Sequence, residues 1–217
     1  MKRVFAVFVF LPISCGVFTP PRVSAQTSLG VRAGLNLATF GGEHPAEFDH
    51  RAAMNVGAFL DLPLSGRVGF RVAAEYSGKG AETTFSGGGG NTYSGEIEYR
   101  FGYVEVPAIL KLGVLQGSRA SANLLLGPAL SFNTSCELEM ATPEWRETLK
   151  CEDAGFDVRA VDLSARTGIG IEAQLSERLK VVGESHYSFG LRTVGTSGDG
   201  VKNRGFSMSL GLAFPIS

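Results

Sequence analysis

Apolar and polar side chains alternate one by one along most of the chain. In the first such stretch, Leu29, Val31 and Ala33 alternate with Gly30 and Arg32. Successive side chains of a β-strand point to opposite faces, so this period of two predicts strands with one apolar face. The pattern occurs in eight stretches, residues 29–37, 55–62, 68–77, 97–108, 122–132, 161–172, 179–189 and 206–214.

The segments that join these stretches alternate between long and short. The long segments are residues 39–53, 80–94, 133–158 and 191–204, and the short segments are residues 63–66, 113–119 and 174–178. Outer-membrane β-barrels have long loops at the extracellular end and short turns at the periplasmic end, and their strands of about ten residues cross the membrane when tilted. The alternation therefore predicts consecutive antiparallel strands.

The two faces of the predicted strands differ in charge. One face is nearly free of charge, whereas the other combines glycines with charges of both signs. The charged face carries Arg32, Asp61, Arg71, Glu75, Glu98, Arg100, Glu105, Asp162, Arg166, Glu172, Lys180, Glu184 and His186. Because eight strands leave an interior that side chains fill, we expect these residues to form an ion-pair network that plugs a lumen.

Alternation by itself fits two kinds of barrel. A soluble lipocalin-like barrel would turn the apolar face inward and bind a lipophilic ligand, whereas a membrane barrel would turn it toward lipid. Balanced charges suit a crowded lumen, and aromatic residues near strand ends suit an interfacial girdle. These aromatic residues are Tyr76, Tyr99, Phe132, Phe189, Phe206 and Phe214. The sequence therefore favours an all-β fold, an eight-stranded antiparallel up-and-down transmembrane β-barrel.

The fourth stretch changes phase in its middle. Apolar residues occupy odd positions up to Phe101 and even positions from Val104 onward. One extra residue in a strand shifts the phase in this way, so a β-bulge near Tyr103 is one explanation of the pattern. Pro107, which cannot donate a hydrogen bond to a neighbouring strand, also requires an irregularity in this strand.

The N-terminal stretch is typical of an export signal. Lys2 and Arg3 precede a short apolar run, and the small residues 23–25 precede a cleavage site. We predict a signal peptide at residues 1–25 and a single outer-membrane β-barrel domain at residues 26–217. This arrangement places the protein in the bacterial outer membrane after export to the periplasm.

Two cysteines remain after removal of the signal peptide. An oxidising compartment favours a disulfide between Cys136 and Cys151, and two free thiols are the alternative. Trp145 lies between them and is a candidate contact for a partner. It could equally be the residue that anchors the loop by packing.

Four motifs resemble the PorT-like outer-membrane β-barrel family. They are GVRAGLNL at residues 30–37, YVEVPAILK at residues 103–111, GPA at residues 127–129 and GIG at residues 168–170. The resemblance covers nearly the whole mature chain. It implies a small outer-membrane barrel without a shared catalytic site. Some members assist a secretion system, which makes a secretion-system protein one possible partner.

The sequence leaves several functions open. The first is a structural, adhesive or partner-binding role through the long loops, with outer-membrane lipid and an extracellular or secretion-system protein as partners. The second is a narrow channel or transporter, which needs unpaired lumen charges or a gap along the axis. Without Lys2, Arg3 and Arg22 the chain keeps 17 of its 20 basic residues against 21 acidic ones, so we expect no nucleic-acid partner.

A third function is that of a lipid-acting hydrolase. Glu184, His186 and Ser188 resemble the His-x-Ser arrangement of outer-membrane lipid A deacylases. Such a site must face lipid, whereas the strand parity turns His186 into the lumen. We therefore expect no enzyme, and no residue spacing indicates a metal or cofactor site.

Overall fold

A computed structural model of the protein describes residues 26–42, 48–88, 92–196 and 200–216. The predicted signal peptide, residues 1–25, lies outside the described residues. No helix in the described part of the chain is long and apolar enough to cross a membrane.

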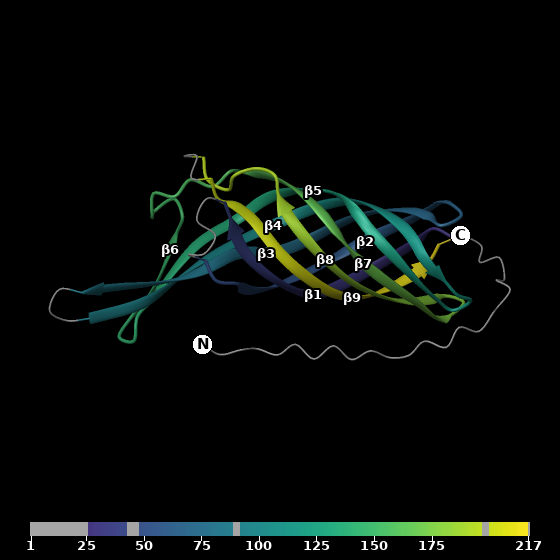
Figure 1. The fold of residues 1–217 in the computed structure, drawn as a ribbon, viewed down its shortest axis with the longest axis horizontal. Coiled ribbons are helices and arrows are strands. Elements are labelled where there is room, and N and C mark those ends of the chain that lie inside the picture. The colour runs from purple at the N-terminus through teal and green to yellow at the C-terminus, as the bar shows by residue number, and fades with distance from the viewer. Residues whose placement is uncertain (1–25, 43–47, 89–91, 197–199, 217) are drawn as a thin grey trace.

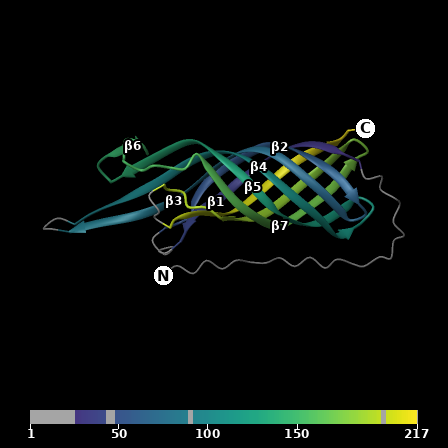
Figure 2. The same cartoon turned by 90° about the horizontal axis from the view of Figure 1, so that it is seen from above.

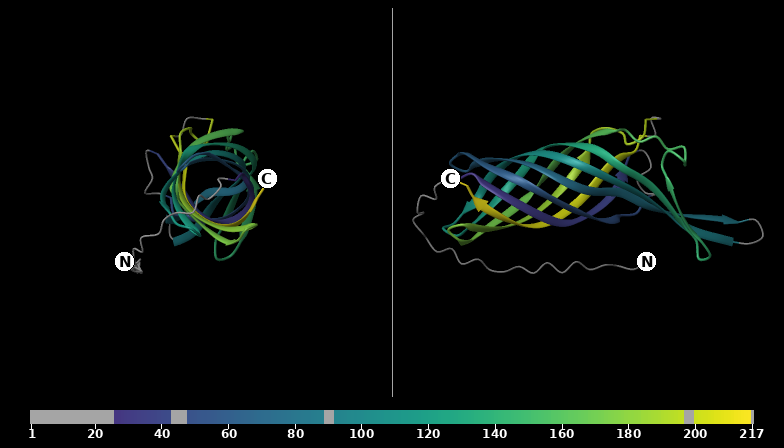
Figure 3. Two further views of the ribbon diagram at one scale, coloured as in Figure 1. Left: turned by 90° about the vertical axis from the view of Figure 1, so that its right-hand side faces the viewer. Right: turned by 180° about the vertical axis from the view of Figure 1, so that it is seen from behind.

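In the described residues, nine strands form a single sheet. The strands are β1 (Ser28–Gly41), β2 (Arg51–Ser65), β3 (Val68–Gly88), β4 (Thr92–Gln116), β5 (Ala120–Ala141), β6 (Arg146–Lys150), β7 (Val161–Ser176), β8 (Leu179–Gly190) and β9 (Lys202–Pro215). Neighbours pair antiparallel, and β5 pairs with β4 on one side and with β7 on the other. The β1–β9 pairing completes a closed ring of eight strands, seen end on in Figure 3. The predicted eight-stranded up-and-down fold is confirmed.

Three strands extend beyond the ring at the end that carries the long connections. β3, β4 and β5 continue past their neighbours as a projecting sheet (Figures 1 and 2). The short strand β6 pairs there with the end of β5, on the side where β7 pairs within the ring. The long connections predicted at residues 80–94 and 133–158 are therefore largely strand in the described structure.

The outward face of the ring is apolar. Its exposed side chains include Leu35, Met54, Leu126 and Leu210, the last of which is 71% exposed. Charged and polar side chains such as Arg71 point inward and are buried. A continuous apolar band of this kind faces lipid in membrane barrels, so the lipocalin-like alternative, which needs an apolar interior, does not fit.

Aromatic residues lie at both rims of the apolar band. Tyr76, Phe132, Phe189 and Phe206 are exposed toward the long-connection end, and Phe214 is exposed near the end with the short turns. This arrangement matches the girdle predicted for a membrane barrel. Tyr99 is the exception, because it lies on the inward side of β4.

The phase change in the fourth strand does not come from a bulge in that strand, as the sequence had suggested. β4 keeps one alternation throughout, with Tyr99, Phe101 and Tyr103 on the same inward side as Glu105. The chemistry of that inward side changes from charged to aromatic where the strand leaves the apolar band. Above the band the surroundings are water, so apolar residues turn inward and charged residues turn outward. The sequence pattern inverts without any slip of the strand.

The bulge occurs in β5 instead. Gly102 pairs with Ser135 while Tyr103 pairs with Asn133, which leaves Thr134 as the extra residue. The pairing of β3 with β4 has a gap beside Pro107, because proline has no backbone N–H to donate to the neighbouring strand.

Candidate functional site in the lumen and at the long-connection end

Ten charged side chains inside the ring form a chain of ion pairs with alternating sign. From the short-turn end they are Glu172, Lys111, Asp61, Arg71, Glu184, Arg32, Glu75, Arg166, Glu105 and Lys79. Each neighbouring pair in this order is a salt bridge. Five cations thus meet five carboxylates, which is how charges removed from water are stabilised.

Arg71 is a fully buried member of this lumen chain. Its Nε and Nη2 donate to the two carboxylate oxygens of Asp61 at 2.5 and 2.6 Å, and its Nη1 donates to Glu184. The guanidinium lies 4.1 Å from the centre of the Phe59 ring. Its side chain is 1% exposed, so two buried carboxylates depend on it for neutralisation.

Glycine provides the volume that these side chains need. Arg32 has Gly57 opposite it on β2 and Gly211 opposite it on β9. A Cβ at Gly57 would lie 2.4 Å from the Cβ of Glu75, which is closer than carbon atoms approach. The glycine-rich inward face is therefore a packing requirement of a narrow, charge-filled ring.

Two members of the lumen chain, Lys79 and Lys111, are not among the residues expected from the sequence. Lys79 bonds Glu105 at 2.6 Å, and Lys111 bonds Asp61 at 2.8 Å. Strand parity could have identified both, since Lys79 is four residues after Glu75 on β3 and Lys111 is six residues after Glu105 on β4.

Other predicted lumen residues have different surroundings. Asp162 accepts a hydrogen bond from Asn203 at 2.9 Å near the long-connection end. His186 lines two small cavities of about 20 and 10 Å³. Lys180 lines a larger cavity at the short-turn end and makes no ion pair within the described residues.

Glu98 and Arg100 do not belong to the lumen, which corrects the prediction. Both lie on the outward face of the projecting sheet, above the apolar band. They join Arg51, Glu139 and Arg146 in a second chain of ion pairs, with contacts of 2.5 to 3.0 Å. The reason is the inversion of polarity described for β4.

The outward position of Glu98 leads to a testable pH dependence. A hydrogen bond from Arg100, with a second from Arg51, holds the pKa of Glu98 below its ordinary value of 4.5. Because the pKa of Glu98 is lower in the folded protein than in the unfolded chain, its ionised carboxylate stabilises the projecting sheet above pH 4.5. This stabilisation is lost as the pH falls through the pKa of Glu98 in the folded protein. We expect a carbon-13 titration of the Glu98 carboxyl in detergent micelles to show a midpoint below 4.5.

The variant Arg100→Gln is expected to move the Glu98 midpoint back toward 4.5. Glu82, directly opposite Glu98 on β3, provides an internal comparison. Burial, with the nearby Glu96 and Glu98 carboxylates, raises the pKa of Glu82, so its midpoint should lie above 4.5 in the same experiment. A Glu98 midpoint at or above that of Glu82 would contradict this assignment.

An aromatic cluster closes the ring at the long-connection end. Its buried members are Phe40, Ala81, Phe101, Tyr103, Cys151 and Val194. Phe156, from the segment after β6, stacks on Phe101 with ring centres 6.4 Å apart and planes 2° apart. We call these six buried residues, together with Phe156, the aromatic cap.

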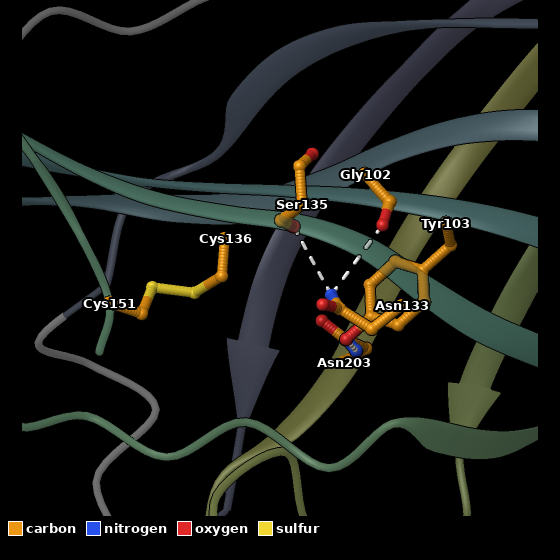
Figure 4. The surroundings of a disulfide bond; sticks show 7 residues. All are labelled: Gly102, Tyr103, Asn133, Ser135, Cys136, Cys151 and Asn203. Atoms are coloured by element: carbon orange, nitrogen blue, oxygen red, sulfur yellow. Dashed lines mark hydrogen bonds between the residues drawn. A yellow bond between two sulfur atoms is a disulfide. The ribbon is translucent and has the colours of Figure 1, made fainter.

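A disulfide joins Cys136 at the end of β5 to Cys151 just after β6, with the Cα atoms 5.4 Å apart (Figure 4). Cys151 is itself a buried member of the aromatic cap. Beside the bond, Asn133 donates a hydrogen bond to the carbonyl of Ser135 at 3.2 Å. The covalent link therefore holds the segment that supplies Phe156 against the mouth of the ring.

Trp145 lies in the tight turn between β5 and β6. The amide of Thr142 donates to the Trp145 carbonyl at 2.9 Å, and the Trp145 side chain is 47% exposed. It does not pack in the aromatic cap. Of the two roles considered for Trp145, an exposed contact residue fits this position better than a packing anchor.

His186 and Ser188 both line the small cavity inside the ring. A lipid-acting hydrolase needs these groups on the outward face. Their inward position removes the geometric basis for that alternative.

The sequence model of the outer membrane protein beta-barrel domain family matches residues 24–194, which is more than half of the chain. The chain belongs to this family. It is a small β-barrel protein of the bacterial outer membrane, so its apolar band contacts outer-membrane lipid. In barrels of this kind the short turns lie at the periplasmic end and the long connections at the extracellular end.

Comparison with curated proteins finds no match. Among solved structures, the chain is similar to Ail, the attachment invasion locus protein of Yersinia pestis, at 12% identity and a TM-score of 0.42 over 88% of this chain and 99% of Ail. It is also similar to Neisserial surface protein A, at 12% identity and a TM-score of 0.47 over 87% of this chain and 97% of that protein. A third similar structure is that of OprG from Pseudomonas aeruginosa, at 7% identity and a TM-score of 0.47 over 88% of this chain and 97% of OprG. None reaches a TM-score of 0.5, so their functions carry no weight for this chain.

Proposed function

We propose that this outer-membrane protein is a recognition platform: a barrel with a plugged lumen that presents a rigid extracellular sheet to a partner protein. The observation that carries the proposal is the projecting sheet of β3 to β6, which is fixed by strand pairing, by ion pairs and by the Cys136–Cys151 disulfide. A surface that is ordered before binding loses little conformational entropy on association.

A plugged lumen is supported by the side chains that fill it. The lumen chain of ion pairs runs along the membrane-spanning part, and the cavities beside it hold only about 20 and 10 Å³. The aromatic cap adds a second barrier at the extracellular mouth. We therefore place a channel or transporter role second, and we assign no catalytic role.

The exposed charges of the projecting sheet and its loops favour an electropositive partner. The exposed carboxylates that make no ion pair within the described residues are Glu96, Glu137, Glu144, Glu147, Glu152, Asp153 and Asp157. Among the described residues of this region, Lys150 is an exposed cation without an ion pair. Trp145 lies among these carboxylates, where an aromatic side chain can anchor a contact and the charges can steer it.

A secretion-system protein is one candidate partner. The hypothesis rests on the motifs at residues 30–37 and 103–111 that resemble the PorT-like family. An extracellular protein with a basic surface fits the charges equally well.

Surface plasmon resonance with a ten-residue polylysine peptide tests the recognition surface. We expect salt-sensitive binding to the wild-type protein in detergent, and at least tenfold weaker binding to the triple variant Glu137→Gln, Glu144→Gln, Glu147→Gln. Glu177, in a periplasmic turn, is the positional control, because Glu177→Gln removes one exposed carboxylate at the other end of the barrel and should bind the peptide as the wild type does. Equal binding by the wild-type and triple variants would refute the acidic recognition surface.

A further inference from the structure

The periplasmic mouth of the barrel contains a cavity of about 220 Å³ that the plugged lumen leaves unfilled. Residues from the short turns and from the periplasmic ends of seven of the described strands line it. Because the lumen chain closes it on the membrane side, this vestibule opens toward the periplasm alone.

The vestibule has an excess of positive charge. Its charged lining comprises the four cations Arg67, Lys111, Arg119 and Lys180 against the two carboxylates Asp61 and Glu172. Both carboxylates already bind Lys111 and Arg71. The other three cations make no ion pair within the described residues, although they converge on one cavity.

The three free cations are held by ordered backbone. The Arg67 carbonyl accepts a hydrogen bond from Gly113 at 2.7 Å, and the Arg119 carbonyl accepts one from Gln174 at 2.7 Å. Lys180 lies on β8, where it pairs with the inward-facing Ala213 of β9. The ring therefore fixes the backbone from which each of these side chains extends to the cavity.

Neutral hydrogen-bonding groups complete the lining. They are Gln26, Ser28, Gln116, Ser118, Ser121, Asn123 and Gln174. Hydroxyl and amide donors beside two arginines and a lysine are the groups that bind phosphate oxygens. Pockets for drug-sized ligands occupy roughly 300–1,000 Å³, so this vestibule suits a smaller anion.

We propose that the vestibule is a binding site for a small, soluble, phosphate-bearing anion that enters from the periplasm, with Lys180, Arg67 and Arg119 as its charged contacts. The site is separate from the extracellular recognition surface. The plugged lumen makes it a site of binding and not a step of transport.

Isothermal titration of inorganic phosphate tests the site. The protein is held in dodecyl maltoside, which carries no phosphate. We expect saturable binding of one phosphate that weakens with added sodium chloride, and at least tenfold weaker binding to Lys180→Gln. Arg178→Gln is the control, since it removes a cation from the adjacent turn outside the vestibule and should bind as the wild type does. Absence of binding, or equal losses in both variants, would overturn the proposal.

Two further arms sharpen the test. Glu172→Gln removes a carboxylate that competes for Lys111, so phosphate should bind more tightly, and weaker binding would argue against an anion site.

Dioctanoyl phosphatidylglycerol below its micellar concentration should not compete with phosphate, because a lipid would approach from the membrane side. Competition would assign the cations to a lipid headgroup and overturn the soluble ligand.

Discussion

Replacement of Arg71 by methionine is expected to lower the free energy of unfolding of the barrel by about 3–5 kcal/mol, the usual cost of removing one partner from a buried ion pair. The variant leaves Asp61 and Glu184, both largely buried, without their shared guanidinium. It also removes the contact with the Phe59 ring. Methionine fills similar volume, so the loss reports on charge and not on a cavity.

Urea unfolding in lipid vesicles measures this effect. Folded outer-membrane barrels migrate faster than boiled ones on a denaturing gel, so the folded fraction is read directly at each urea concentration. Arg178→Met, in an exposed periplasmic turn, should unfold at the wild-type urea concentration. In the double variant with Asp61→Asn, the second substitution should cost less than it does alone, because the two groups are coupled. An Arg71→Met barrel as stable as wild type would refute the plugged-lumen model.

Replacement of both Cys136 and Cys151 by serine is expected to release the extracellular segment while the ring stays folded. The bond closes a loop with a sequence separation of 15, and loss of that closure costs about 3 kcal/mol in the chain-entropy model. Phe156 then loses the link that keeps it stacked on Phe101. The loss is confined to the aromatic cap because the eight strands pair without this bond.

Limited trypsin digestion followed by mass spectrometry detects the release. New cleavage is expected after Arg146, Lys150 and Arg159, at a rate at least tenfold above that of the wild type, while the heat-dependent gel shift persists. Wild-type protein treated with a reductant should give the same fragments. If the oxidised wild type is cut at these sites as fast as the double variant, the disulfide does not hold the cap in place.

Much of the barrel could be predicted from local pattern. Period-two alternation, the sorting of long and short connections, and the separation of charged from apolar faces are properties of consecutive residues. They determine the number of strands in the ring, their direction and which face meets lipid. The cysteine pair likewise needed only the count of cysteines left after export.

The fate of individual charges depended on the tertiary structure. Glu98 and Arg100 have the same alternation as residues within the membrane, yet they face the exterior because β4 rises above the lipid, where water reverses the preferred face. Lys79 lies just before a segment that the sequence suggested to be a loop, and the continuation of β3 brings it to Glu105. The local sequence pattern does not show whether a residue lies within the membrane or above it.

The sequence by itself determined an eight-stranded outer-membrane barrel, because alternation along a strand is a local property that pairing then repeats. Only the tertiary structure decided which charges meet in the lumen, how β6 and the disulfide build the aromatic cap, and where three cations remain unpaired at the periplasmic mouth. These contacts join residues from strands far apart in the chain. Their partners follow from the register and closure of the ring, which no single stretch of sequence specifies.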